Sequence, residues 1–214
     1  MKKLAVAAAL ATLFAVPMLA QAESTFVNPA TAGSTAAARL DFSIVIPQVL
    51  FLRVGTSSGN TATDATVDPI TFTVLGANVG DGSVIAGTGG DLTAGAVTVR
   101  VYGNGGNISL NSATTGPLTN ATGETIPWSQ VSVAAAALTT GTTGFTNAAI
   151  THPAFNTGAA GGNGTATTLA ATNKVVRVEG KWTYSYLNAN PVAAGTYGAT
   201  VARNGRVTYT ATQL

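Results

Sequence analysis

The densest apolar run in the chain lies between Leu40 and Val54 and is divided by Pro47. Before the proline, large apolar residues occupy every second position, which is the spacing of a strand with one buried face. These positions are Leu40, Phe42, Ile44 and Ile46. After the proline both faces are apolar, as in a central strand or one covered from outside. Proline has no N–H for a strand ladder, so we expect two strands that meet at a bend, with the rest of the chain packed around them.

Alternating apolar and polar residues recur along the chain and predict further strands. The segments are 70–74, 96–102, 107–110, 125–133, 175–186, 197–201 and 207–214. Hairpin turns are expected at 103–106 and at Asn204-Gly205, and 139–173 is expected to be a long Gly/Thr-rich surface excursion. No segment has the period of a long amphipathic helix. The pattern therefore predicts an all-β fold, an antiparallel immunoglobulin-like β-sandwich of about nine strands.

The first 22 residues have the features of a secretory signal peptide. Met1-Lys2-Lys3 precedes an apolar run, and Ala20-Gln21-Ala22 provides a small-residue cleavage site. We therefore expect a mature chain, exported to the periplasm, the cell surface or the medium, that begins at Glu23. Residues 23–38 are small and polar and predict a flexible arm, followed by a single domain at 39–214. The uncharged stretch between Asp41 and Arg53 is shorter than the roughly 20 residues of a membrane-spanning helix, so no span is expected in the mature protein.

Charged residues make up only 8% of the chain, against about 25% in an average domain. Without the two lysines of the leader, eight basic residues balance eight acidic ones. This neutrality gives no reason to expect nucleic acid as a partner. A surface with so few charges favours association with other copies. The absence of cysteine excludes disulfides and thiol chemistry.

The residues that could carry catalysis or bind a metal form no recognisable constellation. His152 is the only histidine, and no nucleophile motif accompanies it, so we interpret it as structural or solvent-exposed. The acidic residues show no metal-ligand spacing, and the glycine-rich pieces at 87–90 and 103–106 are interpreted as turns. We predict no catalytic residue, no metal and no cofactor, and hence a non-enzymatic protein.

Four aromatic residues have two possible roles. They would either stack on a sugar from a surface groove or pack in the core, and their place on the inner side of strands favours the core. They are Trp128, Trp182, Tyr184 and Tyr186.

The C-terminal part of the chain resembles the ending of bacterial pilin-like domains of the spore-coat-U and archaic chaperone–usher group. The likeness lies in Pro191-Val192-Ala193-Ala194-Gly195-Thr196-Tyr197-Gly198, followed by the alternating Val207-Thr208-Tyr209-Thr210-Ala211. The resemblance implies assembly by strand donation, in which the arm of one subunit fills an apolar groove in the next. The implied donor is Ser24–Ala38 and the implied groove wall is Val49–Leu52. The candidate assembly residues are Phe26, Val27, Val49 and Phe51.

Together these features predict an exported structural protein, a surface fibre or pilus-like subunit that acts by self-association or adhesion. Its partners would be copies of itself or other surface subunits, with a periplasmic chaperone as a further possibility. The alternative is a monomeric secreted binding module for a polysaccharide or a host-surface ligand. An exported hydrolase is a third class, but no residue set in the sequence supports it.

Overall fold

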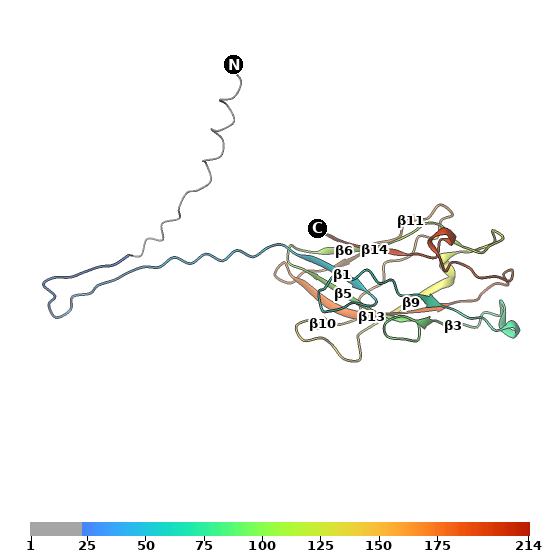
Figure 1. Ribbon diagram of the computed structural model, residues 1–214, viewed down its shortest axis with the longest axis horizontal. Coiled ribbons are helices and arrows are strands. Elements are labelled where there is room, and N and C mark those ends of the chain that lie inside the picture. The colour runs from blue at the N-terminus through green and yellow to red at the C-terminus, as the bar shows by residue number, and fades with distance from the viewer. Residues whose placement is uncertain (1–22) are drawn as a thin grey trace, which may run out of the picture. The chain divides into compact units, whose positions relative to one another are not determined.

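The computed structural model describes residues 23–214 (Figure 1). The expected signal peptide, residues 1–22, lies outside this range. The chain divides into an N-terminal unit that ends at Ile46 and a compact domain, Pro47–Leu214. In the described part of the chain, helix is limited to three short 3₁₀ turns, and none is long and apolar enough to cross a membrane. The prediction of an all-β fold is confirmed.

The larger of the two main sheets is built around β13, the longest strand, which lies between β5 and β1 on one side and β9 and β10 on the other (Figure 1). All its pairings are antiparallel except that of β10 with β13. Its strands are β1 (Leu50–Val54), β3 (Ile85–Ala86), β5 (Ala96–Gly103), β9 (Val131–Ala136), β10 (Thr146–Asn147) and β13 (Val176–Tyr186).

The second main sheet has β6 at its centre. β14 pairs with β6 along one edge, and the short β11 and β12 pair with its other edge. The strands are β6 (Ile108–Thr114), β11 (Gly162–Asn163), β12 (Thr167–Leu169) and β14 (Thr208–Gln213). Two small ribbons complete the fold, β2 (Ile70–Thr71) with β4 (Thr88–Gly89), and β7 (Leu118–Thr119) with β8 (Thr125–Ile126).

Apolar side chains of both main sheets form one core. Alternation places one side of each strand there, as on β6, where Ile108 and Leu110 are fully buried and Ser109 between them is not. Strand β1 contributes Leu52 and Val54 to the same core. The fully buried core residues on the larger sheet include Val99, Val101, Val176 and Trp182.

The other side of the larger sheet is also partly covered. Alternation predicts Glu179 on an exposed face, but Glu179 is fully buried and Arg100 is 3% exposed. Arg100 Nη2 donates to Glu179 Oε2 at 2.7 Å and to Thr142 Oγ1 at 2.6 Å. The prediction of an exposed face is wrong here because loops from distant parts of the chain lie over these two residues, and Asn60 accepts a further bond from Arg100.

Three other segments differ from their predictions. The turn at 103–106 is not a hairpin, because β5 before it and β6 after it belong to different sheets. The stretch 139–173 is not only a surface excursion: it contains β10, β11 and β12, and Ile150 and Pro153 within it are buried. The segment 197–201 is not a strand. A 3₁₀ turn, Val201–Arg203, ends at Asn204 with φ of 57°, and the chain then enters β14. Asparagine tolerates this left-handed conformation, so Asn204-Gly205 makes a turn without being a hairpin between two strands.

Candidate functional site

The segment Leu40–Ile46, predicted to be a strand with a buried face, lies outside every strand and is exposed throughout. Phe42 and Ile44 are 85% and 86% exposed, and Leu40 and Ile46 are exposed to a similar degree. The four apolar residues do alternate along the segment, but no described part of the chain covers their side chains. A row of four large apolar side chains in water is unusual for a soluble chain and is typical of an interaction site.

The part of the N-terminal unit that precedes this segment doubles back on itself. Arg39 donates to both carboxylate oxygens of Glu23, at 2.6 and 2.9 Å, and Thr25 Oγ1 donates to the carbonyl of Ala37 at 2.6 Å. The hydrogen bonds from Arg39 hold the pKa of the Glu23 carboxyl below its ordinary value. Both side chains are exposed, so this pair contributes little to stability.

The four predicted assembly residues divide between the two units. Phe26 is 86% exposed and Val27 is exposed too, both in the N-terminal unit. Val49 and Phe51 belong to the domain and are half-buried. Phe51 is paired with Tyr102 of β5, and its β1 neighbours Leu52 and Val54, rather than Phe51, pack on the core. Whether Val49–Leu52 forms the wall of an acceptor groove therefore stays a prediction.

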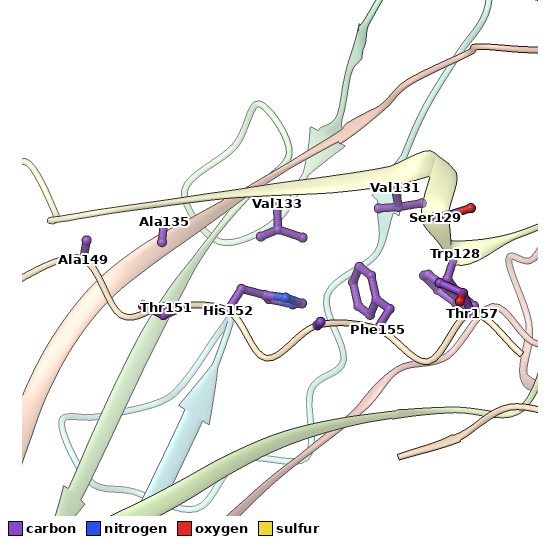
Figure 2. A pocket seen from close by; sticks show the side chains of 11 residues that line it. Trp128, Ser129, Val131, Val133, Ala135, Ala149, Thr151, His152, Phe155 and Thr157 are labelled. Carbon is purple, nitrogen blue, oxygen red and sulfur yellow. The ribbon is translucent and has the colours of Figure 1, made fainter. Parts of the chain in front are cut away.

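A cavity of about 580 Å³ lies between β9 and the extended segment 149–157. Val131, Val133 and Ala135 point into it from β9, and His152 and Phe155 point toward them from the opposite wall (Figure 2). We call this cavity the β9 groove. Its remaining lining residues are Trp128, Ser129, Ala149, Thr151, Ala154 and Thr157. None of them is charged at neutral pH, so the β9 groove suits an apolar occupant.

The β9 strand forms one edge of the larger sheet, because among the described strands it pairs with β13 alone. Gln130, just before the strand, accepts a hydrogen bond from Leu187 N at 2.8 Å. Since bonded and non-bonded pairs alternate in an antiparallel ladder, positions 132, 134 and 136 bond to β13. The N–H and C=O groups of Val133 and Ala135 therefore face away from β13. The edge presents free backbone groups directly beside the β9 groove.

His152 belongs to an aromatic cluster under the β9 groove. Its Nε2 hydrogen-bonds the Tyr209 hydroxyl at 2.8 Å, and the Tyr209 and Tyr184 hydroxyls are 2.9 Å apart. The imidazole packs edge-on against Trp182 and Phe155. Burial lowers the pKa of His152 to about 4, so the ring is neutral at ordinary pH. A catalytic triad instead needs a carboxylate to orient the histidine, whereas here the partner is a tyrosine whose own pKa burial raises well above the ordinary value.

The interpretation of the four aromatic residues as core is confirmed, since all are less than 9% exposed. Each tryptophan also satisfies its indole N–H: Trp182 Nε1 donates to the carbonyl of Ile150 at 2.6 Å, and Trp128 Nε1 to that of Gly116 at 2.8 Å. Trp182 and Tyr184 therefore offer no exposed platform for stacking on a sugar.

Several acidic side chains organise local structure. Asp68 accepts from Thr56, Asp91 accepts from Arg53 and from Thr98 N, and Asp81 accepts from Asn188. Within residues 23–214, His, Cys, Asp and Glu nowhere gather in threes as a metal site requires. The arrangement best suited to a ligand is the β9 groove with its open edge, which can accept an extended apolar segment.

No pattern in the sequence indicates the β9 groove. Alternation at Val131 and Val133 indicated a strand, but it contains no information on which edge stays unpaired. The opposite wall lies in 149–157, where the sequence has no periodicity to follow. The sequence does indicate one possible occupant of a groove, the strand-like pattern at Leu40–Ile46, which directly follows the predicted arm. Comparisons with family models, with curated proteins and with solved structures find no match to this chain.

Proposed function

We propose that this protein is an exported, non-enzymatic structural subunit that self-associates into a surface fibre by strand donation. The observation that carries the proposal is the row of exposed apolar residues at Leu40–Ile46. The two main sheets would form a pilin-like β-sandwich, in line with the resemblance of its C-terminal part. Periplasm, cell surface or medium would be its location, and copies of itself or other surface subunits its partners.

The exposed row provides enough hydrophobic free energy to drive association. Burying one large apolar side chain contributes about 1.5–3 kcal/mol, so four contribute roughly 6–12 kcal/mol before the cost of ordering is subtracted. Backbone hydrogen bonds to a sheet edge would add to this. A chaperone that shields the row before assembly is consistent with the aggregation hazard of such a segment.

The alternative, a monomeric binding module, has less support. It needs aromatic residues in a surface groove, and the residues that sequence patterns offer for this role are buried in the core. It would also leave the exposed row at Leu40–Ile46 without a role.

The test compares full mature chains by size-exclusion chromatography with light scattering. Phe42→Asp combined with Ile44→Asp places charge on the apolar face and is expected to abolish the large assemblies of the unaltered chain. Val45→Asp is the matched control, because Val45 is equally exposed but lies on the opposite face of the segment. Assemblies that persist in the double variant, or an unaltered chain that is a stable monomer, would refute the proposal. Phe26→Asp separately tests the donor predicted at Ser24–Ala38.

A further inference from the structure

We infer that the β9 groove is the acceptor site, and that it receives the Leu40–Ile46 segment of a second copy of this chain. The inference rests on the proposed function and assigns the partner and the binding site within it. It combines an unpaired strand edge, an apolar cavity next to that edge and an exposed segment with the matching pattern.

The backbone of the donor would bond to the open edge of β9. Val133 and Ala135 direct their N–H and C=O groups to this edge, so an added strand extends the larger sheet by one. At about 3.4 Å per residue the six residues of β9 span about 20 Å, and the seven of Leu40–Ile46 about 24 Å. The two lengths match.

The side chains of the donor would fill the β9 groove. In an added strand, every second residue faces the same side as Val133 and Ala135, toward His152 and Phe155. Those positions in the donor are large and apolar, and they meet an uncharged lining. Asp41 and Ser43 would fall on the opposite side, next to the small side chains of Ser132 and Ala134.

The chain cannot fill its own β9 groove. Asn104 Nδ2 donates to the carbonyl of Pro47 at 2.8 Å, which fixes Pro47 near the start of β1. Leu50 there lies opposite Gly103, and Gly103 opposite Val176. Val133 pairs eight residues further along β13, at Tyr184. Adding the two strand spacings from β1 through β5 to β13, and one more from β13 to β9, gives a distance of about 30 Å between the start of β1 and Val133.

The middle of the donor segment would have to cover that distance. Ser43 is four residues from Pro47, which allows about 14 Å at full extension. A second copy must therefore supply the segment. Because the donor leaves from one edge of the sheet and the acceptor is the other edge, the contact is head-to-tail and repeats in each copy, which generates a filament when it does not close into a ring.

The other free edge of the larger sheet is the main competing acceptor. There the side chains of Gln48 and Gln213 hydrogen-bond at 2.6 Å, so β1 and the end of β14 already approach each other. Leu52 and Val54 of β1 are engaged with the core. Because these contacts already occupy part of the β1 edge, we assign the acceptor site to the β9 groove.

Disulfide trapping tests the site, with no native cysteine to interfere. One full mature chain carries Ile44→Cys and another carries Val133→Cys, and the mixture is oxidised and analysed for crosslinked peptides. A disulfide requires Cβ atoms within about 4.5 Å, so we expect about tenfold or more crosslinking over the matched pair Val45→Cys with Val133→Cys. Ala211→Cys lies on β14, the strand that approaches β1, and therefore probes the competing edge.

The outcomes separate the inference from the proposed function. Preferential trapping of Ile44→Cys with Val133→Cys supports both. Two outcomes would overturn the β9 groove as acceptor while leaving strand donation intact. In the first, the chains assemble and Ile44→Cys is trapped with Ala211→Cys. In the second, the chains assemble but Ile44→Cys crosslinks to Val133→Cys no more than Val45→Cys does. Chains that neither assemble nor crosslink refute both.

A peptide provides a second measurement that does not depend on fibre growth. The chain with Phe42→Asp and Ile44→Asp keeps its β9 groove but lacks a donor. A synthetic peptide of residues 39–47 is expected to raise its unfolding temperature, and a peptide with the same two substitutions is not. The shift should disappear when Val133→Asp is added to the chain. An equal shift with and without Val133→Asp would place the peptide elsewhere.

Discussion

The segments Val97–Val101 and Leu40–Ile46 have the same alternating pattern and opposite surroundings. In β5, Val99 and Val101 are fully buried, and even Thr98 and Arg100 on the other face of the strand are at most 5% exposed. In the N-terminal unit, Ile44 is 86% exposed. Alternation therefore specifies an extended segment with one apolar face, but what covers that face depends on the rest of the fold. In β5 the same chain covers it, and for Leu40–Ile46 we propose that a neighbour does.

The largest expected contrast is between the core and the exposed row. Leu110→Ala removes a fully buried side chain and should lower the free energy of unfolding by about 3–5 kcal/mol. Ile44→Ala should leave it unchanged, since the side chain is already in water. Both are measured by urea denaturation in the Phe42→Asp background, which is expected to be monomeric. A large loss with Ile44→Ala would mean that the segment packs on its own domain.

The next contrast is between two ion pairs of the domain, Arg100–Glu179 and the less buried Arg53–Asp91. Glu179→Gln leaves Arg100 buried without a counter-charge and should cost about 3 kcal/mol. Asp91→Asn, at the less buried pair with Arg53, should cost about 1–2 kcal/mol. Equal effects in denaturation would contradict the difference in burial between the two pairs.

The Glu179 pair also makes a pH-dependent contribution. Burial alone would raise the pKa of Glu179, but hydrogen bonds from Thr142 N and Arg100 hold it below its ordinary value. Its stabilisation is therefore present above pH 4.5 and is lost as the pH falls through the lower, folded-state pKa.

His152 should cause a loss of stability at higher pH than the carboxylates do. Its pKa is about 4 in the folded protein against 6.5 in the unfolded chain, so between these values the unfolded state binds the extra proton. Stability should thus fall by about 1–2 kcal/mol from pH 6.5 to 4, less than the full shift implies because the ring is partly exposed. In thermal unfolding across this range, His152→Gln should remove most of the decline. An unchanged decline in that variant would assign it to other groups.

Alternation in the sequence predicted the strands whose apolar face packs into the core of the domain. The cores of β5, β6 and β13 follow from alternation, and the assignment of Trp182 to the core followed from its side of the strand. The buried Arg100–Glu179 pair could not be predicted, because the groups that cover it, Asn60 and Thr142, come from loops with no periodicity. The β9 groove depends on which strand stays unpaired, and sheet order is a property of long-range pairing that local patterns do not contain.

The smallest expected effect concerns the ion pair within the N-terminal unit. Glu23→Gln removes the bidentate partner of Arg39, yet both side chains are exposed and salt screens their attraction. The pair also lies outside the compact domain. We therefore expect no measurable change in the unfolding temperature by calorimetry in the Phe42→Asp background. If Glu23→Gln lowered that temperature as much as Asp91→Asn does, the N-terminal unit would be part of the cooperative core, and Leu40–Ile46 would not be free to leave it for a neighbour.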